Sequence, residues 1–185
     1  MESKLLDQIG QTFRKDLPSA DALDGYLDAI LPKARPWSED LSEKKYLGKP
    51  WLEKRDEDDF HQIVLHFFNN DDEYIKSVNG DIAVGKWRFL EKTNKLIIFP
   101  DGDDDGELYD LAFQDDEFFV LAKHGDQKKL GHRKYFFMVI ESRGKKLEWR
   151  EAVELLFKKT QSNVSFYILI LIIIVLLLAI FLVLR

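Results

Sequence analysis

The segment 123–134 differs most from the acidic chain around it. Five lysines and arginines stand there against a single acidic residue, Asp126, and Gly125 and Gly131 would let backbone amides approach a phosphate closely. Such a segment could bind anionic lipid headgroups, a nucleotide or an acidic partner. The alternative is a solvated turn that balances the acidic loops nearby. The candidate contact residues are Lys123, Lys128, Lys129, Arg133 and Lys134.

A second loop, 101–106, carries carboxylates at alternate positions and a glycine at the sixth, as the start of a calcium-binding loop does. The twelfth position of such a loop needs a bidentate glutamate, and here that position is Ala112. The sequence therefore favours a solvated acidic hairpin that discourages pairing between sheet edges. A weak calcium-binding candidate is formed by Asp101, Asp103 and Asp105.

The four histidines do not predict a metal site or a general base. His61 and His66 are an odd number of residues apart on one expected strand, so they should face opposite sides of it. His124 and His132 stand at the two ends of one loop, but no third ligand is fixed by spacing. Cysteine is absent, and no nucleophile elbow, zinc-protease motif or dinucleotide fingerprint is present. We expect no cofactor, no metal and no enzymatic activity.

An apolar run, 166–184, is the strongest single feature of the chain. It begins at Phe166, ends at Leu184 and contains no charge, glycine or proline. As a helix it would measure about 28 Å, close to the thickness of the hydrocarbon core of a bilayer. Lysines and arginines precede the run, and no secretory signal opens the chain. The sequence predicts a tail-anchored, single-pass protein with a cytoplasmic N-terminal domain, in a membrane that we take to be the bacterial inner membrane.

The net charge and the length narrow the remaining choices. The formal charge of the chain is −6, which disfavours a general nucleic-acid binder. The roughly 160 residues before the apolar run suffice for one domain with a substantial core. The lipid bilayer is the one partner that the sequence predicts directly.

The elements expected before that run are two helices, a series of short strands and a third helix. Leu5, Leu6, Ile9 and Phe13 share one helical face, and a second helix should start at a Ser19 cap. Turn residues such as those at 79–80, 93–94 and 115–116 predict hairpins and hence antiparallel neighbours. The expected strands are 46–52, 60–68, 73–78, 81–90, 95–99, 107–113, 117–123 and 134–140.

About eight antiparallel strands in simple order avoid exposed edges best by closing into a barrel. A two-sheet sandwich is the alternative. The strands at 118–121 and 135–140 are apolar on both faces, so helices should cover them. Trp149, Ala152, Val153 and Leu156 form one apolar stripe on the helix expected at 147–159. The expected organisation is a helical segment over 1–36, a β domain over 37–145, an amphipathic helix over 146–160 and a transmembrane helix over 166–184.

The strand series resembles the lipocalin-like domains of the calycin group. The resemblance covers roughly 46–140. It rests first on Gly85-Lys86-Trp87-Arg88-Phe89, which contains the short Gly-x-Trp motif. It rests also on the regularly spaced apolar strands that follow, at 96–99, 108–111 and 117–121. It implies a mainly β, α+β fold: a small antiparallel barrel of the kind that in many members holds a lipid or another apolar ligand.

We therefore expect a non-enzymatic binding or scaffold module at the membrane surface, taking a small apolar ligand or a protein partner. The alternative is a nucleotide-responsive membrane effector of a bacterial defence or signalling system. It would be similar to membrane-anchored barrel proteins of some antiviral systems, in which a bound nucleotide drives oligomerisation of the membrane helices. The cationic segment 123–134 keeps this alternative open. A membrane-surface enzyme would need His124 or His132 beside a carboxylate in a pocket.

Overall fold

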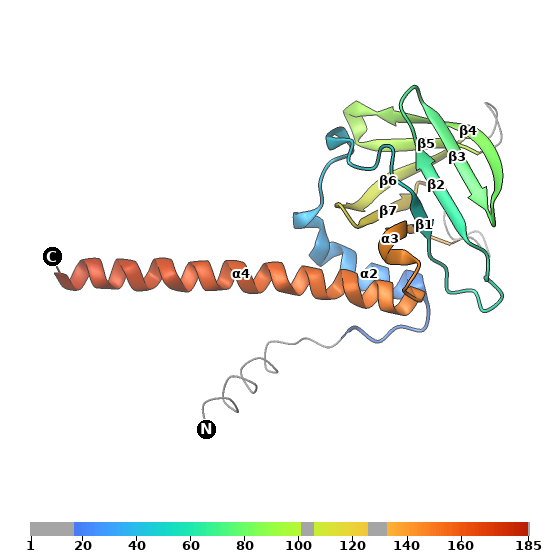
Figure 1. Ribbon diagram of the computed structural model, residues 1–185. Helices are drawn as coiled ribbons and strands as arrows, with labels where there is room; N and C mark the ends of the chain where they lie inside the picture. The colour runs from blue at the N-terminus through green and yellow to red at the C-terminus, as the bar shows by residue number, and fades with distance from the viewer. Residues whose placement is uncertain (1–16, 101–105, 126–132, 185) are drawn as a thin grey trace.

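The computed structural model describes residues 17–100, 106–125 and 133–184, without the side chains of 161–170, 176, 179–180 and 183–184. Within these ranges, eight antiparallel strands follow one another in chain order and close into a barrel (Figure 1). Closure is confirmed because the first strand pairs with both the second and the last. The strands are β1 (Trp51–Glu53), β2 (Val64–Phe68), β3 (Glu73–Val78), β4 (Asp81–Leu90), β5 (Lys95–Phe99), β6 (Glu107–Gln114), β7 (Phe118–Lys123) and β8 (Tyr135–Ile140).

The strand positions agree with the expected ones, except around β1 and β2. Both strands are shorter than predicted, since residues 54–63 form a loop between them. The hairpin turn between β3 and β4 has positive φ at Asn79 (51°) and Gly80 (99°), as a type I′ turn requires. In this simple order the loops after β1, β3, β5 and β7 all reach the same end of the barrel, which we call the mouth.

The opposite end of the barrel is closed by aromatic packing. Tyr46 and Phe119 stack with ring centroids 5.2 Å apart, and the Trp51 ring lies 5.5 Å from that of Phe119. On β4, Gly85 and Trp87 are both buried, whereas Lys86 and Arg88 between and after them are exposed. The fully buried aromatic and aliphatic side chains that fill this end are Leu41, Tyr46, Trp51, Phe68, Leu96 and Phe119.

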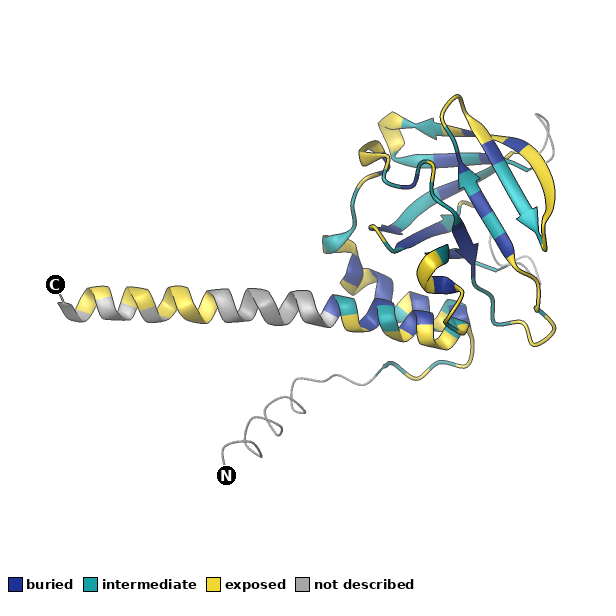
Figure 2. Cartoon of the chain, viewed as in Figure 1, coloured by how far each residue is buried: buried dark blue, intermediate teal, exposed yellow. Residues whose placement is uncertain are grey.

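Two helices cover the strands that are apolar on both faces. α2 (Leu23–Ala34) and the first turns of α4 (Trp149–Leu184) lie side by side against the outside of β7 and β8 (Figure 1). Figure 2 shows their buried faces turned toward the barrel. The predicted cover is therefore confirmed. The buried residues of this second core are Leu23, Leu27, Ile30, Phe118, Val120, Phe137, Val139, Ala152, Val153 and Leu156, with others around them.

The start of α2 differs from the prediction. The helix begins at Leu23 instead of next to Ser19, and Ala22 at the N-cap position makes no side-chain cap. The Leu23 N–H instead donates to Asp56 Oδ2 at 2.7 Å, so a carboxylate from the β1–β2 loop satisfies it. The predicted Ser19 cap is wrong because a tertiary contact replaces the local one. The helix expected from Leu5 to Phe13 lies outside the described residues.

α4 is one continuous helix of 36 residues, about 54 Å long. The sequence predicted a covering helix and a separate apolar helix joined by 160–165, and the structure has no break there. The C-terminal half of α4 extends away from the barrel (Figure 1). Among the side chains that the structure describes, no helical stretch combines the length and hydropathy needed to cross a membrane. The shorter helical elements of the described residues are α3 (Glu141–Gly144) and the 3-10 turns Arg35–Trp37, Leu41–Glu43 and Glu91–Thr93.

Candidate functional site

A polar pocket of about 340 Å³ opens at the mouth of the barrel. We call it the mouth pocket. Its lining combines aromatic and aliphatic side chains with charged ones, five cations against three carboxylates. The cations are Arg55, Lys76, Lys123, Arg133 and Lys134; the carboxylates are Glu53, Glu57 and Glu107; the remaining lining is His66, Tyr74, Ile98, Pro100, Tyr109, Tyr135 and Phe136.

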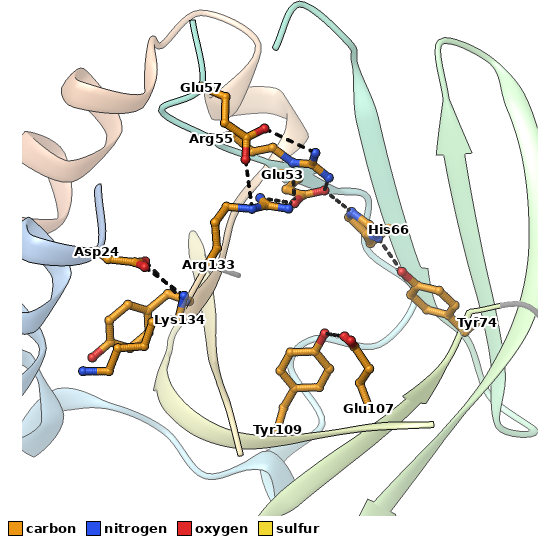
Figure 3. Close-up of polar contacts among 11 residues, drawn as sticks. Asp24, Glu53, Arg55, Glu57, His66, Tyr74, Glu107, Tyr109, Arg133 and Lys134 are labelled. Carbon is orange, nitrogen blue, oxygen red and sulfur yellow. Dashed lines mark hydrogen bonds and ion pairs between the residues drawn. The ribbon is translucent and has the colours of Figure 1, made fainter. Parts of the chain in front are cut away.

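Glu53 is the centre of the charged network. It ends β1 pointing into the barrel, and its side chain is only 3% exposed. Arg55 donates to both of its oxygens, at 2.8 and 3.0 Å, and Arg133 donates to Oε1 at 2.8 Å (Figure 3). Burial alone would raise the pKa of Glu53, but hydrogen bonds from His66 and Arg55 outweigh it and hold the pKa well below its ordinary range. Glu53 is therefore ionised at neutral pH.

His66 extends this network into the barrel interior. It faces inward from β2, with 2% of the residue exposed, and its Nε2 lies 3.1 Å from Glu53 Oε2. Its Nδ1 lies 2.6 Å from the Tyr74 hydroxyl. Burial lowers the pKa of His66 despite the neighbouring carboxylate. The arrangement fits a neutral ring in which Nε2–H donates to Glu53 and Nδ1 accepts from the tyrosine.

Glu57 approaches the same two guanidinium groups from the solvent side. Its Oε1 lies 3.3 Å from Arg133 Nε, and its Oε2 lies 3.7 Å from Arg55 Nη1. Its side chain is 44% exposed. The Arg55 guanidinium also stacks over the Phe60 ring, 4.2 Å from its centroid. The arginines are thus held between an inner and an outer carboxylate (Figure 3).

Two further residues of the mouth pocket are paired with Glu107, whereas Lys76 is not paired with any described residue. Glu107 accepts hydrogen bonds from the Tyr109 hydroxyl and from Lys123. Burial, together with the Glu107 carboxylate, raises the pKa of Tyr109. Lys76 faces the pocket from β3, directly across from His66, and makes no ion pair with any residue in the described ranges.

α2 fixes the start of β8 beside the pocket. The backbone N–H groups of Lys134 and Tyr135 donate to Asp24 at 2.8 and 3.3 Å. One turn further along α2, Asp28 accepts from the Lys134 ammonium and from the Tyr135 hydroxyl. Burial and the Asp28 carboxylate raise the pKa of Tyr135 to about 12. The covering helix therefore positions one wall of the site.

The candidate residues of segment 123–134 are partly brought together. Lys123, Arg133 and Lys134 all line the mouth pocket, each paired with a carboxylate. Lys128 and Lys129 lie outside the described residues. So do the calcium candidates, whose positions are Asp101, Asp103 and Asp105.

One described histidine falls in a different place from that predicted. His61 lies in the exposed 54–63 loop and not on β2, so the prediction that it shares a strand with His66 is wrong. His124 lies 2.7 Å from Asp110 on the outer surface, with both side chains more than 40% exposed, and does not line the mouth pocket. His132 is outside the described residues. In the described ranges no three metal-ligating side chains converge.

Sequence reasoning missed the inner part of the site, namely Glu53, Arg55, His66 and Tyr74. Two signals were present. Glu53 and Arg55 are charged residues at the inward positions that continue the apolar strand beginning at Trp51. His66 interrupts the otherwise apolar strand Val64–Phe68. A polar residue on the core face of a strand needs a partner, and this requirement could have linked the two.

Guanidinium and ammonium groups surround the mouth pocket, and this arrangement is suited to holding an anion. Comparison of the chain with family models, with curated proteins and with solved structures finds no match.

Proposed function

We propose that this protein is a membrane-anchored, non-enzymatic binding module of lipocalin-like architecture, which holds a small anionic molecule in the mouth of its barrel. The observation that carries the proposal is the mouth pocket, a cavity of about 340 Å³ in which five cations outnumber three carboxylates. A pocket of this size accommodates a small metabolite. The lipocalin-like part rests on the eight-stranded meander and on the packing of Gly85 and Trp87.

An apolar ligand is less well supported than a charged one. The interior beyond the pocket is filled by buried rings, including Trp51, Phe68 and Phe119. A lipid chain would need these side chains to move apart, at the cost of a close-packed core. The cations of the mouth pocket offer an anionic group immediate partners instead.

The membrane anchor is proposed from the apolar run 166–184 and from α4. Leu171, Ile172, Ile174 and Leu178 are 48–61% exposed in the isolated chain, where nothing in the described residues covers them. Thr160 is still buried, and Phe166 follows it by about 9 Å along the helix, so the barrel would sit close to the bilayer. The basic residues that precede the run, at 145–146, 150 and 158–159, support a cytoplasmic barrel at a bacterial inner membrane.

Membrane attachment is tested by placing three arginines in the apolar run. Ile172→Arg, Ile174→Arg and Leu178→Arg together cost about 8–10 kcal/mol on insertion, similar to what the apolar residues of the run contribute. The wild type should stay in the membrane pellet after alkaline extraction, and the triple variant should not. The matched control replaces three exposed apolar residues of the barrel, Ile63, Ile82 and Val84, by arginine. Equal fractionation of all three proteins would refute the anchor.

Ligand binding is tested by native mass spectrometry of the full chain released from detergent micelles. A co-purified anion that leaves on mild activation supports a carrier or sensor. The same spectrum after Arg133→Gln should lose the adduct, because this residue lines the pocket and is 31% exposed, so it is not required by the core. A bare wild-type protein that also shows no thermal shift with phosphorylated or carboxylated compounds would refute the ligand-binding proposal.

One alternative has an observation in its favour. Beside the cations of the mouth pocket stand the rings of Tyr74, Tyr109 and Phe136, and a base stacked on an aromatic ring next to a bound phosphate is how proteins hold nucleotides. A nucleotide-responsive membrane effector therefore remains the second candidate. Cross-linking in membranes with and without cyclic nucleotides would distinguish it, because only an effector changes its oligomeric state on binding.

A further inference from the structure

The two carboxylates that hold the arginine pair, Arg55 and Arg133, differ sharply in their surroundings. Glu53 lies on the inner side, 3% exposed, with His66 as a third partner. Glu57 lies on the outer side, 44% exposed, at 3.3 and 3.7 Å from the guanidinium nitrogens (Figure 3). The contacts that Glu53 makes with the arginines are short and buried, whereas those of Glu57 are longer and exposed to solvent. Only the inner carboxylate is needed to compensate the buried end of the pair.

Glu57 is free to leave the arginine pair at little structural cost. It belongs to the loop 54–63 and to no strand, so rotation of its side chain breaks no ladder hydrogen bond. Its backbone carbonyl accepts from the Phe60 N–H, a contact that the side chain does not share. Exposed ion pairs of this length are weak, because water competes for both groups.

We propose that the arginine pair is the anchoring site for a doubly charged oxyanion, such as the phosphate group of a small molecule, and that the Glu57 carboxylate occupies this site in the empty protein. The ligand enters by displacing Glu57 toward solvent. The inference rests on the proposed ligand-binding function of the mouth pocket, and it adds the chemical group recognised and the residue that competes for it.

The charge balance selects a dianion over a monoanion. When Glu57 moves out, Lys123 and Lys134 stay paired with Glu107 and Asp28. The remaining cations of the pocket, Arg55, Arg133 and Lys76, then face the single carboxylate of Glu53. A carboxylate ligand merely replaces one single charge by another on the same guanidinium groups. A phosphate dianion adds a second charge and further oxygens, for which Lys76 is the natural partner because it lines the same pocket and has no ion pair with any described residue to give up.

The test measures binding of inorganic phosphate, with acetate for comparison, to the full chain in detergent micelles by calorimetry at mildly alkaline pH. Glu57→Gln should bind phosphate about 2- to 10-fold more tightly than wild type, because two weak competing ion pairs are removed. Arg133→Gln should bind it at least about tenfold more weakly, as expected for a lost charged hydrogen bond. Acetate should bind more weakly than phosphate throughout.

Two surface substitutions serve as matched controls. Glu154→Gln and Arg143→Gln remove the same charges from exposed ion pairs away from the mouth pocket, with side chains 51% and 60% exposed. Both should leave phosphate affinity unchanged. A thermal melt of each variant reports whether the barrel is folded, so loss of binding by an unfolded protein is recognised.

The outcomes separate this inference from the function on which it rests. If wild type binds phosphate and Glu57→Gln binds it no more tightly, the displacement by Glu57 is refuted while ligand binding stands. If Arg133→Gln binds as well as wild type, the arginine pair is not the anchor. If no variant binds phosphate and no anion co-purifies, the inference and the proposed function fail together.

Discussion

Replacing Glu53 by glutamine tests whether one buried carboxylate holds the barrel mouth together. The substitution keeps the shape of the side chain but removes the charge that Arg55, Arg133 and His66 share. Removing one member of a buried ion pair costs about 3–5 kcal/mol, because the partner charge is left uncompensated. Here the two guanidinium groups are 20% and 31% exposed and can recover some water. We therefore expect a loss of about 3 kcal/mol in the free energy of unfolding at neutral pH.

The pH dependence of that loss has a definite sign. The pKa of Glu53 is lower in the folded than in the unfolded state. Its contribution to the free energy of unfolding is therefore complete above the unfolded-state pKa of about 4.3 and disappears as the pH falls through the folded-state pKa. The difference between wild type and Glu53→Gln should therefore be constant from neutral pH to about pH 5 and shrink only below about pH 4.

The assay is urea unfolding of the full chain in detergent micelles, followed by tryptophan fluorescence. Trp51 and Trp87 are buried in the barrel and report its opening. The control is Glu57→Gln, which contacts the same arginines from solvent and should cost less than about 1 kcal/mol. The buried carboxylate does not hold the barrel mouth together if the free energy of unfolding of Glu53→Gln lies within about 1 kcal/mol of the wild-type value, or if the two variants are destabilised equally.

Three other substitutions act on the barrel interior. Burial lowers the pKa of His66, so the free energy of unfolding of the wild type should fall by up to about 1.4 kcal/mol per pH unit below about pH 6.5. The free energy of unfolding of His66→Gln should fall less over the same range. Urea midpoints that change in parallel for the two proteins would contradict this. Phe119→Ala, at a side chain with no exposure between two other rings, should cost about 3–5 kcal/mol by the same assay. Gly85→Ala would place a Cβ 2.1 Å from the Phe99 carbonyl oxygen and should lower the free energy of unfolding by about 2–3 kcal/mol. A melting temperature equal to that of wild type would contradict this and show that β5 moves to make room for the methyl group.

The strand order was predictable because each strand is bounded by local turn chemistry. Asn79 and Gly80 favour one hairpin type by themselves, and the apolar runs on either side have the length of strands. The need to cover β7 and β8 was equally visible, since both faces of those strands are apolar. Closure was favoured because an open meander of this length would leave two bare edges, but the pattern also allowed a two-sheet sandwich, and the structure decided between them.

The helix boundaries were less predictable. The N-terminus of α2 is satisfied by Asp56, which is 33 positions away from Leu23, and no local rule identifies such a partner. The continuity of α4 through 160–165 was also missed. The polar residues at 161–163 predicted a connecting segment between two helices. Instead, the helix that begins on the barrel continues through them.

Local sequence patterns were enough to predict the features that depend on neighbours along the chain: the meander of eight strands, the apolar faces that require cover, the long apolar run and the excess of cations between 123 and 134. Which charged groups pair with one another depends instead on the folded barrel. Barrel closure brings Glu53 from β1, His66 from β2 and Arg133 from just before β8 within hydrogen-bond distance, although they are up to 80 positions apart. Pairing between distant strands depends on register and closure, and the periodicity of a single strand carries no information on either.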